Sequence, residues 1–203
     1  GEFSALVANN TISFEDGLKL VFLRAKAMQK SCENTNGTMA AILGLDDEKI
    51  KEICRNYNGN VIAANFNCPG QVVISGEINS VKDICEKFNS LGARRSLILP
   101  VSGAFHSSLM NDAKSELKEA IDSTNFSGPS CPIYQNFNAN KTVVISEIKN
   151  NLINQLTNPV LWTQTVNNMI NDGINDFIEV GPGKVLQGLI RKINRDCSTK
   201  SAL

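Results

Sequence analysis

Outside its centre, the chain repeats apolar residues at the three- and four-residue spacing of amphipathic helices. Residues 1–8 read as a helix already under way, with no capping residue ahead of it, which predicts that sequence is missing upstream. Ser13 to Asp16 resemble the capping box of a second helix. The buried face of that helix is expected to consist of Leu18, Val21, Phe22, Ala25 and Met28.

The last hundred residues continue this helical pattern. Amphipathic helices are predicted at 110–121, 148–156, 162–170 and 185–193, and Ser146 is the expected N-cap of the second of these. Only 133–136 and 177–180 read as strands, and the polar end 196–200 is expected to fray. Strands that alternate with helices usually form a parallel sheet of about five strands. The chain therefore reads as the C-terminal part of an α/β domain that lacks its first strands.

Residues 37–101 follow a different pattern and are predicted to form a small unit of their own. Strands near its two ends enclose a hairpin whose turn contains Pro69 and Gly70. Two amphipathic helices complete it, the first opened by acids at 46–48 and the second capped by Asn79 or Ser80. The order βαββαβ is the ferredoxin-like arrangement. The predicted division is a small subdomain, 37–101, inserted into a larger one made of 1–36 and 102–203.

Charge and cysteine content argue against several classes of function. Lysine plus arginine and aspartate plus glutamate number 20 each, so no basic surface for nucleic acid is expected. The six cysteines form no C-x-x-C pair and there is one histidine, so no metal site is predicted. Thiols on apolar helix faces favour a reducing cytoplasm. No apolar run reaches the roughly 18 to 20 residues that a membrane-spanning helix needs, and no signal-peptide pattern opens the chain.

The only histidine, His106, lies at a predicted loop-to-helix junction. An imidazole can take a proton from a nucleophile and return it to a leaving group near neutral pH. Gly103 permits a tight turn ahead of it, and Phe105 can exclude water on one side. A histidine that merely caps or packs at a helix start is the alternative. Arg24, on the flank of the second helix's apolar face, could likewise be an ordinary solvated arginine.

Six segments, in order along the whole chain, carry recognisable motifs: GEFSAL at 1–6, LRAKAMQ at 23–29, NFNCPGQVVISG at 65–76, PVSGAFHS at 100–107, QLTNPV at 155–160 and EVGPGKVL at 179–186. Together they resemble the malonyl-CoA:acyl carrier protein transacylase family. The first is similar to the end of the family's G-H-S-L-G-E nucleophile elbow, and the others include those that hold its arginine and its histidine. The resemblance implies an α/β fold with a hydrolase-like parallel-sheet core, incomplete here, and malonyl transfer from coenzyme A to acyl carrier protein in fatty acid biosynthesis.

The resemblance also implies residue roles. The nucleophilic serine would stand two residues before Gly1, and His106 would be the general base, its second N–H bound by the main-chain carbonyl of Gln155. Arg24 would grip the malonyl carboxylate, Phe105 would leave no room for an α-methyl branch, and Asn65 would border the cleft. No resident cofactor is implied, because coenzyme A enters as the thioester substrate and the acceptor protein carries its own phosphopantetheine.

The implied partners are malonyl-CoA, acyl carrier protein and the missing N-terminal part of the same enzyme, with no nucleic acid and no membrane. Acyl carrier protein is acidic, so basic residues are the candidates for receiving it: Arg94, Arg95, Lys184, Arg191 and Lys192. Each of these could also be ordinary surface charge, and Asn65 an ordinary hairpin residue. Cys68 is a rival nucleophile without an evident partner to lower its pKa. An α/β-type serine hydrolase or thioesterase and a non-catalytic fragment remain alternative functions.

Overall fold

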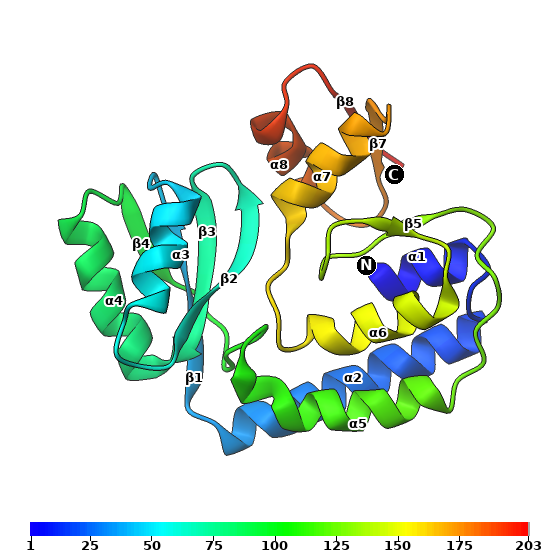
Figure 1. Ribbon diagram of the computed structural model, residues 1–203, viewed down its shortest axis with the longest axis horizontal. Helices are drawn as coiled ribbons and strands as arrows, with labels where there is room; N and C mark the ends of the chain where they lie inside the picture. Colours follow the sequence, from blue (N-terminus) through cyan, green and yellow to red (C-terminus); the bar gives the residue numbers. More distant parts are fainter. Residues whose placement is uncertain (203) are drawn as a thin grey trace.

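The computed structural model describes residues 1–202, which form an α/β fold with both antiparallel and parallel strand pairs. A four-stranded antiparallel sheet and two helices occupy the left of Figure 1. The strands lie in the order β2-β3-β1-β4. Along the chain this part runs β1 (Gly37–Leu43), α3 (Asp47–Arg55), β2 (Val61–Cys68), β3 (Gln71–Glu77), α4 (Ile78–Ser90) and β4 (Arg95–Ile98).

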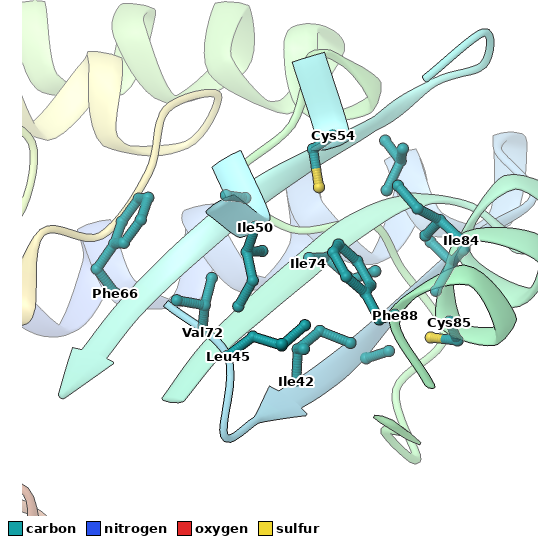
Figure 2. Close-up of a cluster of buried hydrophobic side chains, with 14 residues drawn as sticks. Ile42, Leu45, Ile50, Cys54, Phe66, Val72, Ile74, Ile84, Cys85 and Phe88 are labelled. Carbon is teal, nitrogen blue, oxygen red and sulfur yellow. The ribbon is translucent and has the colours of Figure 1, made fainter. Parts of the chain in front are cut away.

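The two faces of this sheet have different neighbours, because successive side chains of a strand point to opposite sides. Ile42, Val72 and Ile74 are fully buried on the face that packs against α3 and α4, together with Phe88 (Figure 2). The other face presents a second apolar cluster, of Met39, Ala64 and Val73, against which Val101 and Phe105 pack. The sheet is therefore a platform for the segment that holds the histidine.

Four helices form the second large part of the molecule, at the lower right of Figure 1. They share a core of aliphatic side chains that includes Leu6, Leu20, Leu117 and Leu152. The long second helix begins as the capping box predicts, since the Ser13 hydroxyl accepts a hydrogen bond from the Asp16 backbone N–H at 3.0 Å. The helices are α1 (Glu2–Ala8), α2 (Phe14–Asn34), α5 (Asn111–Asp122) and α6 (Ile145–Gln155), with a short 3-10 turn, η1 (Ser108–Met110), ahead of α5.

The remaining elements are two helices and two pairs of short strands. The parallel pair was not expected, because the polar end predicted to fray forms β8 instead and pairs with β7. A second unexpected strand, β6, pairs with β5. The elements are β5 (Ile133–Tyr134), β6 (Lys141–Thr142), α7 (Trp162–Asn171), β7 (Asp176–Glu179), α8 (Val185–Ile193) and β8 (Ser198–Ser201).

The apolar face predicted for the second helix is wrong except at Met28, which packs against the helical core. Leu18 is 61% exposed and Phe22 64%, whereas the buried positions of α2 are Gly17, Leu20, Ala27, Ser31 and Cys32. Most of these residues are small because α1 and α5 pack closely on that side, where a Cβ on Gly17 would lie only 2.5 Å from a Val7 methyl. Within residues 1–202, nothing covers the large apolar side chains of the other face.

Two predicted helix caps also differ. Glu77 rather than Asn79 or Ser80 stands at the N-cap of α4, and α6 begins one residue before Ser146, with Val144 at its N-cap. Neither N-cap side chain makes a capping hydrogen bond, so tertiary packing sets these two starts. In the part of the chain that the structure describes, no helix has the length and apolarity to cross a membrane, and no cluster of three or more His, Cys, Asp or Glu side chains could hold a metal ion.

The cysteines of residues 1–202 are unpaired, and their exposure differs sharply. Cys131 is exposed, whereas Cys32, Cys54, Cys68, Cys85 and Cys197 are buried. Burial raises the pKa of Cys54 to about 12 and that of Cys85 to about 11. Burial also raises the pKa of Cys68, so this thiol does not have the features of a nucleophile.

We expect a disulfide-exchange reagent such as Ellman's reagent, at pH 8, to label one thiol per native chain rapidly and all six after denaturation, because the thiolate must be accessible to react. The reaction is followed by absorbance. Cys131→Ser should abolish the rapid phase. Rapid labelling of two or more thiols in the native chain would contradict this burial pattern.

Candidate functional site

His106 lies in a sharply turned loop between β4 and η1. Its backbone φ of +61° is in the left-handed region, which non-glycine residues seldom adopt. The next residue secures the turn: the Ser107 hydroxyl donates to the Ala104 carbonyl at 2.6 Å and accepts from the Leu109 N–H at 3.2 Å. The local geometry thus fixes the direction in which the imidazole leaves the chain.

The same loop is pressed against two other elements. A Cβ on Gly103 would lie 2.2 Å from Sγ of Cys32 at the end of α2, and one on Gly37 would lie 2.6 Å from the backbone nitrogen of Ala104. Glycine is required at both positions, because any side chain would force these segments apart. The loop is therefore held between α2 and the start of the four-stranded sheet.

The imidazole of His106 is oriented by the last residue of α6. Its Nδ1 lies 2.8 Å from the main-chain oxygen of Gln155, which belongs to the last turn of a helix, where carbonyls lack a partner within the helix. Because a carbonyl can only accept, Nδ1 carries the hydrogen and Nε2 keeps a free lone pair. Burial lowers the pKa of His106, the Gln155 carbonyl opposes this shift, and the charge of Arg24 adds to it. The site therefore favours a neutral imidazole that can accept a proton.

Arg24 reaches the same glutamine from α2. Its Nη2 lies 3.5 Å from Oε1 of Gln155, a long hydrogen bond. Its buried Nε has no hydrogen-bond partner, and none of the ion pairs within residues 1–202 includes the guanidinium. Burial lowers the pKa of Arg24. A partly buried cation with an unused donor is costly unless an anion completes it, so this group is suited to bind a carboxylate.

A third charged group, which sequence reasoning missed, is Glu2 at the start of α1. Its Oε1 accepts hydrogen bonds from Nε2 of Gln155 and from the N–H of Asn136, both at 2.7 Å, and its Oε2 accepts one from Nε2 of Gln135 at 3.2 Å. An acid in the first turn of a helix is ordinary, because it complements the helix dipole. Only its position directly after the proposed elbow could have drawn attention to it.

Phe105 and Asn65 lie on the sheet side of the site. Phe105 is half-buried against the cluster of Met39, Ala64 and Val73. Asn65 is a half-buried residue of β2. Its backbone forms an isolated parallel β-bridge with Val160, five residues beyond Gln155. This bridge joins the four-stranded sheet to the segment that follows α6.

A cavity of about 360 Å³ opens beside Glu2, between the start of α1 and the last two helices. Its lining is mixed, with Asn67, Asn136, Trp162 and Leu186 among its residues. The indole Nε1 of Trp162 is buried and has no hydrogen-bond partner. The lining thus combines apolar and polar side chains.

The five basic residues that the sequence suggested fall into two groups. Arg94 and Arg95 are exposed at β4, while Lys184, Arg191 and Lys192 lie at or on α8, which packs against β2. Because β2 and β4 are the opposite edges of the sheet, the two groups are separated (Figure 1). Arg191 is bonded to Thr199 and Lys192 to Gln71, whereas neither Arg94 nor Arg95 has a side-chain partner within residues 1–202.

Residues 1–202 match the acyl transferase domain family. The malonyl CoA-acyl carrier protein transacylase of Staphylococcus aureus (strain MRSA252) is 42% identical over 204 residues, which are 99% of this chain and 66% of the relative. The Bacillus subtilis (strain 168) protein of the same name is 42% identical over 202 residues, or 98% of this chain and 64% of the relative.

Solved structures agree with these relatives. An acyl carrier protein S-malonyltransferase from Vibrio cholerae superimposes with a TM-score of 0.96 at 39% identity and covers 100% of this chain and 67% of its own. A malonyl-transacylase solved in complex with a type II polyketide acyl carrier protein gives 0.93 at 37% identity, covering 100% and 65%. The chain thus spans about two thirds of the length of the relatives it matches, and it belongs to the acyl transferase domain family.

Proposed function

We propose that the complete protein transfers a malonyl group from coenzyme A to acyl carrier protein in fatty acid biosynthesis. The observation on which this rests most is that Gln155 contacts both the imidazole of His106 and the guanidinium of Arg24. A base and a carboxylate-binding cation thus share one support. The names of the relatives supply the donor and the acceptor.

The proposed chemistry is ping-pong transfer through a serine that precedes Gly1. His106 takes the serine proton at Nε2 as the hydroxyl attacks the malonyl thioester, and returns it to the sulfur of the departing coenzyme A. It then takes the proton of the phosphopantetheine thiol, which attacks the malonyl-serine, and returns that proton to the serine oxygen. Coenzyme A is a substrate here, so the reaction uses no resident cofactor.

Arg24 would select the acyl group. Its guanidinium can hold the free malonyl carboxylate through two parallel hydrogen bonds. An acetyl group lacks that carboxylate and leaves the cation unpaired. The unused Nε of Arg24 favours this role over a hydrolase or thioesterase for uncharged acyl groups. Phe105, packed against the sheet, would limit branching next to the carboxylate, and Asn65 would border the acyl chain.

We further propose that 37–101 is a ferredoxin-like subdomain, inserted into a hydrolase-like α/β subdomain made of 1–36 and 102–203. The sheet order β2-β3-β1-β4, with α3 and α4 packed against the sheet, supports the first part. A segment ahead of Gly1, which would account for the greater length of the relatives, would complete the second and cover the exposed apolar face of α2. The cytoplasm, the predicted compartment, would keep the free thiols reduced.

Among the five basic residues, we propose Arg94 and Arg95 as the first contacts for acyl carrier protein. They are exposed and have no side-chain partners within residues 1–202, and the neighbouring Leu97 and Ile98 are 46% and 47% exposed. Cations that rim an apolar patch suit an acidic partner. Lys184, Arg191 and Lys192 would form a second, weaker contact, because two of them already donate within the chain.

Arg24→Ala in the full-length protein tests the proposed function. Losing two charge-assisted hydrogen bonds should lower kcat/KM for malonyl-CoA by roughly 100-fold or more, and that for acetyl-CoA by less than about threefold. Transfer to acyl carrier protein is followed by gel shift or mass spectrometry. Lys26→Ala, an exposed neighbour on α2, is the control and should change neither value. Equal losses for both acyl groups would show that Arg24 does not read the carboxylate.

The pH dependence of kcat/KM should report His106. A base must be deprotonated, so activity rises with pH through the pKa of the imidazole; since burial lowers that pKa, the midpoint should lie below about 6.5. His106→Ala should reduce the rate by about 10² to 10⁴ and remove this limb of the profile. A midpoint above neutrality would argue against a buried, neutral imidazole as the base.

Charge reversal tests the docking surface. Arg94→Glu with Arg95→Glu should raise the KM for acyl carrier protein about tenfold at low salt, leaving malonyl loading unchanged. The difference from the unsubstituted protein should shrink at high salt, where such attraction is screened. Arg191→Glu with Lys192→Glu is the matched pair on α8 and should have the smaller effect. The opposite ranking would move the docking surface to α8.

A further inference from the structure

Glu2 is a half-buried residue whose carboxylate has no direct ionic partner within residues 1–202. None of the ion pairs within residues 1–202 includes it, and Arg24 lies on the far side of the Gln155 amide. Burial raises the pKa of Glu2, and the hydrogen bonds it accepts from Asn136, Gln135 and Gln155 oppose this shift. Such a group is expensive to bury unless several donors satisfy it. The hydrogen bonds from Asn136, Gln135 and Gln155 meet this requirement for the Glu2 carboxylate.

A carboxylate differs from an amide in one respect that matters here. An ionised carboxylate only accepts hydrogen bonds, whereas the side-chain amide of glutamine both donates and accepts. Because Glu2 only accepts, each amide beside it must present its NH₂ group. Gln135 does so and consequently accepts a bond from Asn151 through its own Oε1 at 3.0 Å.

The same rule fixes the amide of Gln155. Its Nε2 donates to Glu2 at 2.7 Å, so its Oε1 must point the other way, where it meets Nη2 of Arg24 at 3.5 Å. If the Gln155 amide were rotated by about 180°, its NH₂ group would face the N–H donors of the Arg24 guanidinium, and no acceptor would lie between them. Glu2 is therefore linked to Arg24 through the oriented amide of Gln155 and does not contact the guanidinium directly. The other donors of the guanidinium remain available to a ligand.

This arrangement has an advantage over a direct ion pair. A carboxylate in contact with Arg24 would occupy the donors that a ligand needs, while a guanidinium with no negative charge nearby would be costly to bury. The charge of Glu2 raises the pKa of Arg24 against the effect of burial. The guanidinium thus stays charged and unoccupied.

We propose that Glu2 is a positioning residue for the acyl-binding site, which acts through the side chain of Gln155 to hold Arg24 oriented toward the carboxylate of the donor. The inference rests on the proposed function, because it assumes that Arg24 binds a malonyl carboxylate. Glu2, which directly follows the glycine of the proposed elbow motif, would thereby contribute to substrate selection.

Glu2→Gln in the full-length protein is the test, since it keeps the shape and removes the charge and the acceptor-only character. The KM for malonyl-CoA should rise about tenfold with kcat within about threefold, because the lost orientation affects binding of a group already charged in the ground state. The kcat/KM for acetyl-CoA should stay within about threefold. The ratio of the two kcat/KM values is the readout, which a general loss of packing would not change.

Two further variants separate positioning from structural support. Asn151→Ala removes a buried side chain of the same network that donates to Gln135 and makes no hydrogen bond to the side chain of Gln155, so it should lower the melting temperature and leave the acyl ratio unchanged. In an Arg24→Ala background, Glu2→Gln should cause no further loss of selectivity, because residues that act as one unit are not additive.

The outcomes are distinct. If the unsubstituted full-length protein does not transfer malonyl, the proposed function itself fails. If it does, and Glu2→Gln leaves the malonyl-to-acetyl ratio unchanged, or changes it equally in the presence and absence of Arg24, the positioning role is wrong. A tenfold fall in the ratio that vanishes in the Arg24→Ala background supports it.

Discussion

The site depends on one residue at the end of one helix. Gln155 uses its main-chain oxygen to orient His106, and the two ends of its side-chain amide to meet Glu2 and Arg24. The carbonyl is available because helices end with unpaired acceptors. Its position is set by the packing of α6, whose Ile148 and Leu152 are buried in the helical core. A shift of α6 would therefore move the contacts of both proposed functional groups together.

The second constraint is the close approach of three segments around the histidine loop. The face of the four-stranded sheet that carries Met39 and Val73 supports Phe105, and glycines at 37 and 103 let β1 and α2 touch the loop. The left-handed backbone at His106 is sustained by these contacts and by Ser107. The sheet thus matters to the site through the face opposite α3 and α4.

Much of this fold could be predicted from the sequence, because its strongest signals are local. The alternating strands and amphipathic helices of 37–101 and the capping box at Ser13 follow from side-chain periodicity and turn chemistry. The buried face of α2 could not, because small residues such as Gly17 and Ala27 lie inward while the larger Leu18 and Phe22 are exposed, against the usual pattern of an amphipathic helix. The strand at 198–201 could not be predicted either, because its polar residues carry no apolar alternation and its pairing with β7 is a backbone interaction.

The candidate site was only partly predictable, for a related reason. A lone histidine and a motif-borne arginine are visible in the sequence, but their meeting at Gln155 depends on how α2, α6 and the loop pack. Glu2 was invisible because an acid in a first helical turn has an ordinary explanation on the surface. What distinguishes it is a half-buried position beside three hydrogen-bond donors, which only the tertiary structure reveals.

The charges of the site also suit a reaction in which one imidazole works first as a base and then as an acid. Before the donor binds, the charge of Arg24 adds to burial in lowering the pKa of His106, so the imidazole is neutral and can accept the serine proton. In the proposed reaction a bound malonyl carboxylate neutralises that cation. The imidazolium formed as the serine attacks then loses a repulsive neighbour and can hold the proton until the leaving thiolate takes it. If Arg24 selects the substrate as proposed, the same cation keeps His106 neutral, and therefore a base, until the malonyl carboxylate has bound.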